Sequence, residues 1–358
     1  MIRMVFINYF MKGDKPNISY INIILLLIRR FIMKNRSILK TLILILVIII
    51  ISLGFIFQKK ILLCYNIIDE YISIQSNIPS QENINISATT SMDYHDIVYK
   101  NTNSIPLTLD IYSPTKKVYK ASPVILYVHG GSWAYGDKAI PEALTPVLDT
   151  FRNNGYTIIS TSYELMRDKE SFSKQVSDIK DTIRWIYKNN DTYNMDPNEI
   201  GILGTSSGAH LSLMAAYSKP DEFIDDPELA DYPSDVKYLI DLFGPTDLSL
   251  LNTNDLNYDL SNIFSSISNK EELIDKFNPV NYVNSKIPDT LIIHSKADTM
   301  VPYTSSEKLY EKCKDVKASA KLITLDKSAH DLSSISKEDI IEVSKGLLLF
   351  IVRNSPYR

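Results

Sequence analysis

Short, nearly uninterrupted apolar runs alternate with helical stretches from about Tyr94 onward, and this alternation restricts the possible folds more than any other feature. Most of the runs are typical of strands buried on both faces, while the first alternates apolar and polar residues like a half-exposed antiparallel strand. The runs cover residues 105–114, 124–130, 156–163, 200–206, 238–244, 290–295 and 321–326. The helical candidates cover residues 139–153, 173–189, 207–218, 304–313 and 338–353. The pattern predicts an α/β fold with a mostly parallel central sheet and helices on both faces.

Two segments depart from this alternation. Residues 59–93 are polar, rich in Asn and Ser and without a clear period, so we interpret them as a linker or stalk. Residues 248–288 contain no run typical of a buried strand, and we interpret them as a small cap inserted over the carboxyl edge of the sheet. The folded domain is therefore expected over residues 94–358. Hydrophobic residues make up 45% of the chain, which excludes a disordered body.

Before the linker lies an apolar run over residues 38–58 that only Lys40 interrupts. At about 1.5 Å per residue, about 20 helical residues span the roughly 30 Å hydrocarbon core of a bilayer. Apolar runs of this length are rare in soluble domains, where a helix usually keeps one polar face. We therefore expect a transmembrane anchor over residues 38–58.

The charge of the chain is unevenly distributed. Residues 1–60 hold ten basic side chains and one acidic one, a net +9, and the remainder holds 28 basic and 41 acidic ones, a net −13. The basic residues before the apolar run predict a cytoplasmic N-terminus and a folded domain outside the cell membrane. An acidic body repels phosphate backbones, which excludes nucleic acid as a partner.

A cleaved signal peptide and a secreted product form the alternative interpretation of the same run. No small-x-small site follows it, and Lys59 and Lys60 end it, so we favour a retained anchor. Met33 and the basic stretch after it would begin a well-formed export signal. We hypothesise that translation starts at Met33, so that most of the basic N-terminal segment 1–37 is not translated.

A candidate nucleophile lies between a predicted strand and a predicted helix. Residues 204–208, Gly-Thr-Ser-Ser-Gly, fit the G-x-S-x-G pattern, in which the serine occupies a sharp strand-to-helix turn. The pattern alone is a weak signal, because an ordinary loop of small residues matches it as well. Its position directly after residues 200–203 and before the helix from 207 favours Ser206 as a nucleophile.

A serine hydroxyl needs a general base, and in this arrangement the acid and then the histidine follow the serine in the chain. His294 lies inside an apolar strand and is interpreted as structural. His330 lies in a loop after the last strand, where it could act as the base, and its alternative is an exposed loop histidine. Asp298 follows the strand 290–295 and is the expected acid, with Asp331 as its rival.

Small residues after the strand 124–128 are candidates for binding a developing oxyanion. Backbone N–H groups of Gly130, Gly131 and Ser132 can face an attacked carbonyl there, and the N–H of Ser207 would be the second donor. His129 is expected to fix this loop by hydrogen bonding. Trp133 and Tyr135 either line an acyl or sugar pocket or pack against the sheet, two alternatives that stay open.

These motifs together resemble the α/β-hydrolase fold esterases and lipases related to hormone-sensitive lipase. The resemblance covers about residues 94–353 and is carried by HGGSWAYGDK, GTSSGAHLS, LFGPTDL, HSKADTMVPY and SAHD; the HGG-x-W form is closest to a branch of small carboxylesterases. It implies a catalytic triad of Ser206, Asp298 and His330. The sequence departs from the group at Ser132, Ser207 and Asp331, where glycine, alanine and glycine are usual.

The function that follows is a serine carboxylesterase that hydrolyses short acyl or acetyl esters, including acylated glycans, outside the membrane. The alternatives are an amide-bond hydrolase, formamidase-like or peptidase-like, on the same machinery, and a non-catalytic surface protein. Neither a metal nor an organic cofactor is expected. The two cysteines, Cys64 and Cys313, exclude a disulfide framework and a cysteine zinc site.

Overall fold

The computed structural model describes residues 36–77, 92–101, 106–251, 269–330 and 335–356, and these fall into two compact units that divide after Gln58. The first unit contributes the helix α3 (Arg36–Ile56). The second unit contains a helix, α4 (Gln58–Asn77), that begins at the division, followed by an α/β domain.

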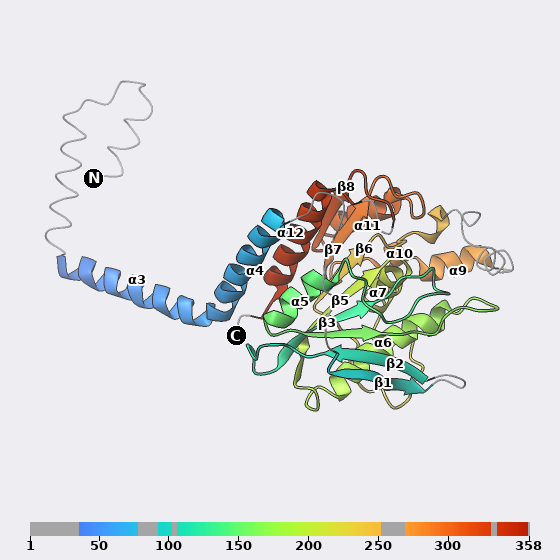
Figure 1. Cartoon of the computed structure of the whole chain (residues 1–358), viewed down its shortest axis with the longest axis horizontal. Coiled ribbons are helices and arrows are strands. Elements are labelled where there is room, and N and C mark those ends of the chain that lie inside the picture. The colour runs from blue at the N-terminus through green and yellow to red at the C-terminus, as the bar shows by residue number, and fades with distance from the viewer. Residues whose placement is uncertain (1–35, 78–91, 102–105, 252–268, 331–334, 357–358) are drawn as a thin grey trace, which may run out of the picture. The chain divides into compact units, whose positions relative to one another are not determined.

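The described strands of the domain form one eight-stranded sheet in the order β1-β2-β4-β3-β5-β6-β7-β8 (Figure 1). The pairs β1–β2 and β2–β4 are antiparallel, and every other pair is parallel. The predicted mostly parallel sheet is thus confirmed. The strands are β1 (Tyr94–Asn101), β2 (Pro106–Tyr112), β3 (Ser122–Val128), β4 (Thr157–Thr161), β5 (Met195–Thr205), β6 (Tyr238–Leu242), β7 (Asp289–Ser295) and β8 (Ala320–Leu325).

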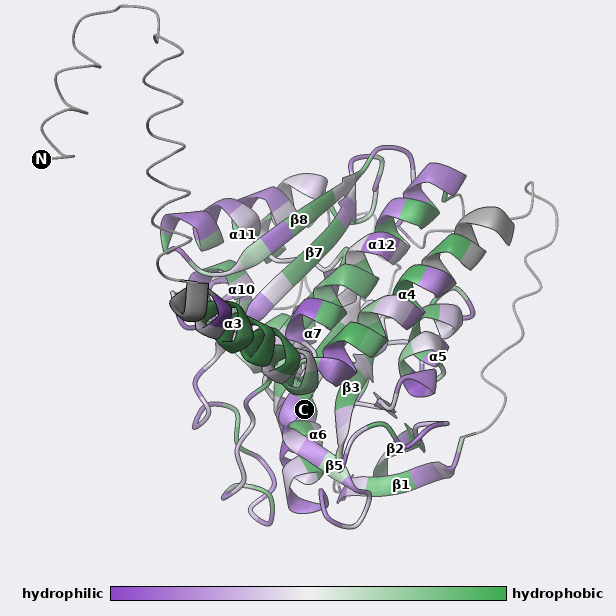
Figure 2. Cartoon of the chain, turned by 90° about the vertical axis from the view of Figure 1, so that its left-hand side faces the viewer, coloured by the Kyte–Doolittle hydropathy of each residue, from purple (hydrophilic) through white to green (hydrophobic). Residues whose placement is uncertain are grey.

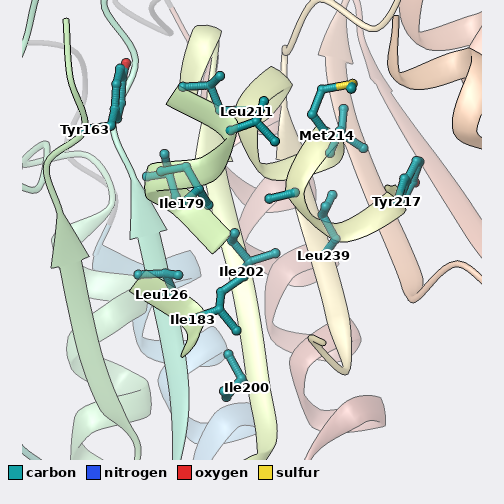
Figure 3. Packing of buried hydrophobic residues seen from close by; sticks show 14 of the residues in the cluster. Leu126, Tyr163, Ile179, Ile183, Ile200, Ile202, Leu211, Met214, Tyr217 and Leu239 are labelled. Carbon is teal, nitrogen blue, oxygen red and sulfur yellow. The ribbon is translucent and has the colours of Figure 1, made fainter. Parts of the chain in front are cut away.

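Helices cover both faces of this sheet (Figure 1). One core contains side chains of α6, α7, α9 and α11, and the other contains side chains of α4, α5 and α12. Figure 3 shows part of the first core, where Leu211 and Met214 of α7 pack near Ile202 and Leu239 of the sheet. The helices are α5 (Thr145–Asn153), α6 (Phe172–Lys188), α7 (Ser207–Tyr217), the 3-10 turn η1 (Leu248–Leu250), α9 (Lys270–Phe277), α10 (Pro279–Tyr282), α11 (Tyr303–Asp315) and α12 (Lys337–Asn354).

Strand β3 shows why the apolar runs predict the sheet so well. Successive side chains of a strand point to opposite faces, so a strand covered by helices on both sides needs apolar residues at every position. Val124 and Leu126 accordingly belong to the core on one face, and Ile125 and Tyr127 to the core on the other. All four are at most 1% exposed. Strand β1 has no such run because it is an edge strand that leaves most of its side chains exposed or half-exposed, and it was not predicted.

The inserted segment 248–288 contains η1, α9 and α10 in its described part, and α10 packs against α7. Residues 252–268 lie outside the described residues. The assignment of this segment as a cap stays a prediction.

Helix α3 covers most of the predicted anchor, and Figure 2 shows it as an almost wholly hydrophobic helix. Its large apolar side chains are exposed, with exposed fractions between 40% at Ile56 and 76% at Phe55. No single helix in the described part of the chain is long and apolar enough to cross a bilayer. The stretches Lys40–Ile56 and Gln58–Asp69 meet that requirement only as a pair with a bend between them.

Residues 58–77 form a continuous helix where a linker was predicted. The reason is a short apolar repeat within the polar sequence. Leu63 and Ile67, four residues apart, lie on one face of α4 and are 2% and 3% exposed, because they join the core shared with α5 and α12. Residues 78–91 of the predicted linker lie outside the described residues.

Asp241 of β6 is a buried acid within this sheet. Its side chain is fully buried; Oδ1 accepts the Gly244 N–H at 2.8 Å, and Oδ2 has no hydrogen-bond partner among the described residues. Burial raises the pKa of Asp241 to about 7, against the effect of the Gly244 N–H. The folded protein therefore holds this proton to a higher pH than the unfolded chain, whose aspartates titrate near about 3.9.

We predict that Asp241→Asn stabilises the protein more at pH 8 than at pH 5. Between about pH 4 and pH 7 the unfolded chain loses this proton first, so a wild-type protein with a raised folded pKa loses stability as the pH rises. The neutral amide of asparagine has no proton to lose in this range. The free energy of unfolding of the variant at pH 8 should therefore exceed that of the wild type by on the order of 1 kcal/mol or more. Thermal unfolding midpoints of both proteins at pH 5 and pH 8 measure it. An equal gain at the two pH values would contradict the explanation.

Candidate active site

The candidate residues lie in four loops that follow β3, β5, β7 and β8. Because these strands are parallel, their carboxyl ends meet at one edge of the sheet, where sites of α/β proteins form. Gly130 follows β3, Ser206 follows β5, Asp298 follows β7 and His330 follows β8. Residues that are far apart in the sequence therefore meet at this edge.

Ser206 occupies the turn between the last residue of β5 and the first residue of α7. Its φ of 50° and ψ of −122° are rare for a residue with a side chain, at a cost of roughly 1–3 kcal/mol. The Ser206 N–H donates to the Leu242 carbonyl at 2.9 Å, which holds the turn against β6. Gly208 lies close to the end of β3, where any Cβ would be 2.2 Å from the His129 carbonyl oxygen. Only glycine permits that approach.

Ser206, His330 and Asp298 form a continuous chain of hydrogen bonds. His330 Nδ1 lies 2.7 Å from Asp298 Oδ2, and its Nε2 lies 2.8 Å from Ser206 Oγ. An ionised carboxylate only accepts, so Nδ1 carries the proton and Nε2 is free to accept the serine hydroxyl proton. This is the geometry of an activated nucleophile, a base and an orienting acid. The His330 ring also packs edge-on against Phe243, with ring centroids 5.0 Å apart.

His294 lies on the other side of Asp298. It is fully buried, and its Nε2 lies 3.1 Å from Asp298 Oδ2 and 3.0 Å from the Val301 carbonyl oxygen. Both partners are acceptors, so Nε2 carries the proton and Nδ1 accepts from the Ser306 hydroxyl at 2.7 Å. The sequence interpretation of His294 as structural overlooked this contact with Asp298. The spacing His294–Asp298 within one strand-to-loop turn is the signal that could have indicated it.

Asp298 is held in its ionised form by this environment. Oδ2 accepts from both histidines, and Oδ1 accepts the N–H groups of Met300 and Val301 at 2.9 Å each. Burial alone would raise the pKa of Asp298, but the hydrogen bonds from His294 and His330, with the charge of His330, outweigh it. The pKa of the carboxyl group is therefore well below its usual value, and the group stays an acceptor for His330.

The loop after β3 has a strained backbone beside the nucleophile. Gly131, Ser132 and Trp133 have φ values of 126°, 52° and 64°, and the Ala134 and Tyr135 N–H groups close a tight turn on the Gly131 carbonyl. Gly130 adjoins Ser206, since a Cβ there would lie 3.2 Å from Ser206 Cβ. His129 donates from Nδ1 to the Gly130 carbonyl at 2.7 Å, as expected for a residue that fixes this loop.

Trp133 packs inside the domain instead of lining a pocket. It is 2% exposed, and its ring lies against Phe172 and His210. The indole Nε1–H donates to His210 Nδ1 at 3.2 Å, and His210 Nε2–H donates to the Phe277 carbonyl at 2.8 Å. Burial lowers the pKa of His210 to about 4, so the ring stays neutral and keeps Nδ1 as an acceptor. This chain of contacts holds the strained loop in place.

Other features of the domain lie apart from these residues. A polar cavity of about 530 Å³ borders β1 and α6, and no member of the Ser206 hydrogen-bond chain lines it. Over the described ranges, no group of three or more His, Cys, Asp or Glu side chains is arranged to hold a metal ion. Asp331, the rival acid, lies outside the described residues.

Comparison with known proteins agrees with this geometry. The chain is 27% identical over 205 residues to the esterase LipQ of Mycobacterium tuberculosis, which covers 55% of this chain and 47% of the relative. It is 26% identical over 231 residues to the isoprenylcysteine alpha-carbonyl methylesterase ICME of Arabidopsis thaliana, which covers 62% of this chain and 53% of the relative. The chain thus spans about half the length of these curated relatives.

Solved structures share the fold. A truncated carbohydrate esterase from gut microbiota superposes with a TM-score of 0.61 at 24% identity, over 75% of this chain and 98% of the other. Esterase 2 of Thermogutta terrifontis superposes with a TM-score of 0.58 at 21% identity, over 73% of this chain and 93% of the other. Residues 109–313, more than half of the chain, match the protein family described as BD-FAE. The chain therefore belongs to the BD-FAE family and has the α/β-hydrolase fold.

Proposed function

We propose that the chain is a serine carboxylesterase that hydrolyses short acyl or acetyl esters through an acyl-enzyme on Ser206. The observation that carries the proposal is the unbroken hydrogen-bond chain from Ser206 through His330 to Asp298, at 2.8 and 2.7 Å. These distances are those of a serine that a neighbouring base can deprotonate during attack.

In the first half of the reaction, Ser206 Oγ forms a bond to the ester carbonyl carbon while His330 Nε2 takes the hydroxyl proton. The carbonyl oxygen becomes an oxyanion, which accepts hydrogen bonds from backbone N–H groups of the set Gly130, Gly131, Ser132 and Ser207. Asp298 stabilises the imidazolium of His330 without taking its proton. His330 then gives the proton to the departing alkoxide, which leaves as an alcohol.

In the second half, a water molecule takes the place of the alcohol. His330 accepts a proton from this water, the hydroxide oxygen bonds to the acyl carbon, and a second oxyanion forms in the same place. The bond to Ser206 Oγ breaks and His330 returns the proton to the serine, which releases a carboxylic acid. The strained turns at Ser132 and Ser206 hold the donors and the nucleophile in position before substrate arrives.

The names of the relatives support an ester as the substrate. LipQ and LipC are both esterases, and ICME acts as a methylesterase. The Thermogutta esterase has been solved with propionate and with butyrate bound, and the gut structure is that of a carbohydrate esterase. We therefore propose short acyl esters, acylated glycans among them, as the substrate class.

A second candidate is hydrolysis of an amide bond. It is favoured by a match of 28% identity over 136 residues to the arylacetamide deacetylase of Bos taurus, over 37% of this chain. The attack by Ser206 would be the same, but His330 would have to protonate a departing amine. Rates on an aryl acetate and on the matching aryl acetamide distinguish the two candidates.

We also propose that α3 inserts into the cell membrane and keeps the domain outside it. The support comes from the exposed apolar side chains of α3 and from the basic residues at and before its start, Lys40 among them. A signal sequence that is later cleaved is the alternative. The intact mass of the membrane-extracted protein distinguishes a retained helix from a cleaved one.

Replacement of Ser206 by alanine is expected to abolish turnover of p-nitrophenyl acetate, by roughly 10³-fold or more, because no other group can form the acyl intermediate. The same variant should no longer be labelled by a fluorophosphonate probe. Ser218→Ala is the matched control, since Ser218 lies at the other end of α7. Unchanged turnover by the Ser206 variant would exclude the proposed mechanism.

Replacement of His294 by phenylalanine removes one donor from the Asp298 carboxylate and should lower kcat/KM about 10- to 100-fold. That range corresponds to about 1.5–3 kcal/mol, which is typical of a hydrogen bond to a charged group. Because this donor lowers the pKa of Asp298, its loss should also raise the pKa of that carboxyl group.

His294→Gln is the matched control for this effect, since its amide can place an N–H close to the position of the lost Nε2–H. It should restore most of the activity. A glutamine variant that is as slow as the phenylalanine variant would show that His294 acts through packing and not through its hydrogen bond to Asp298.

A further inference from the structure

Helix α4 is part of the catalytic domain on one of its faces. Leu63 and Ile67 are buried in the core that also contains α5 and α12. Lys60 Nζ donates to the Arg353 carbonyl at the end of α12 at 2.7 Å, and Asn66 donates to Asn154 after α5 at 2.7 Å. Figure 2 shows α4 beside α5 and α12, in agreement with these bonds.

The other face of α4 presents apolar side chains to solvent. Ile61, Tyr65, Ile68 and Ile72 are spaced by four, three and four residues, which places them in one stripe along the helix. Their exposed fractions are 57%, 68%, 57% and 56%. A helix that packs on a soluble domain normally turns polar residues outward, because a large apolar side chain left in water gains no free energy of burial. The stripe therefore indicates that α4 contacts a second apolar partner in addition to the domain.

The position of α4 directly after α3 indicates what this partner is. α3 ends at Ile56 and α4 begins at Gln58, so a single residue separates the exposed apolar helix from the stripe-bearing one. If α3 lies in the bilayer, as proposed above, the first turns of α4 start at the bilayer surface. At about 1.5 Å per residue, Ile61 is only a few residues beyond it. Lys59 at the start of α4 suits the headgroup region, which favours cations.

We propose that the stripe of Ile61, Tyr65, Ile68 and Ile72 lies in the interfacial layer of a lipid bilayer, so that α4 has the catalytic domain on one face and lipid on the other. This inference rests on the proposed insertion of α3. An interfacial helix of this type lies in the membrane plane with its apolar face among the acyl chain ends. The catalytic domain is then held against the membrane surface and does not swing on a flexible stalk.

Lipid quenching of tryptophan fluorescence tests the proposal on the full chain. Tyr65→Trp places a reporter in the stripe, and Phe55→Trp places one in α3; the native Trp133 and Trp185 are buried in the domain and give the background in the wild type. In vesicles of brominated phosphatidylcholine, both variants should lose emission relative to the same vesicles without bromine. Both should also emit at shorter wavelength than in denaturant without lipid, where the indole is in water.

The possible outcomes separate this inference from the anchor on which it rests. Quenching of both reporters supports it. Quenching of the Phe55→Trp reporter without quenching of the Tyr65→Trp reporter overturns it and leaves the anchor intact, and quenching of neither overturns both. A Tyr65→Trp reporter that is blue-shifted without bromine quenching, and that loses the shift when the protein is diluted in the vesicles, would identify a second copy as the occupant and overturn the lipid assignment.

A second variant tests the consequence for the domain. Ile61→Asn with Ile68→Asn should remove the lipid contact of the stripe while Leu63 and Ile67 keep α4 on the domain. Hydrolysis of a soluble aryl ester should stay at the wild-type rate, and bromine quenching of the Tyr65→Trp reporter in this background should be lost. Undiminished quenching with both asparagines in place would contradict the stripe as the binding surface.

Discussion

The parallel alignment of β3, β5, β7 and β8 is the constraint on which the site depends. These strands all end at the same edge of the sheet, so the residues that follow them lie close together. This proximity does not require a specific contact between any two of those residues. The alignment in turn depends on burial, because a parallel sheet is stable only when both of its faces are covered. The two cores of α6, α7 and α11 and of α4, α5 and α12 supply that cover. The geometry of the proposed site is therefore a consequence of hydrophobic packing.

Much of this arrangement was predictable because the relevant signals are local. A buried parallel strand needs apolar residues at every position, so the six strands β3 to β8 are evident as apolar runs. The antiparallel strand β2 is evident from its alternation of apolar and polar residues. Ser206 lies between a run and a helix, and the order of serine, acid and histidine then selects Asp298 and His330. These inferences use only the local sequence around each residue and the rule that the carboxyl ends of parallel strands lie at one edge of the sheet. They needed no knowledge of side-chain contacts.

The features that escaped prediction depend on contacts that a pattern does not encode. His294 resembles any polar residue inside a strand until its Nε2 is seen next to Asp298 Oδ2. Strand β1 is an edge strand with little burial, so it lacks an apolar run. Helix α4 depends on two buried residues, Leu63 and Ile67, in a polar context, and the partner that makes them significant lies almost 300 residues later in α12.

The neutral ring of His210 connects two parts of the domain that the sequence separates widely. One nitrogen receives the indole N–H of Trp133 in the strained loop, and the other donates to the Phe277 carbonyl at the end of α9, within the inserted segment. An imidazole is rigid, so a shift of α9 is passed to the loop as a shift of the same ring. The inserted segment is thereby mechanically coupled to the backbone donors that stabilise charge in the proposed reaction. A substitution that moves the Phe277 carbonyl would then disturb the loop beside Ser206 without touching it.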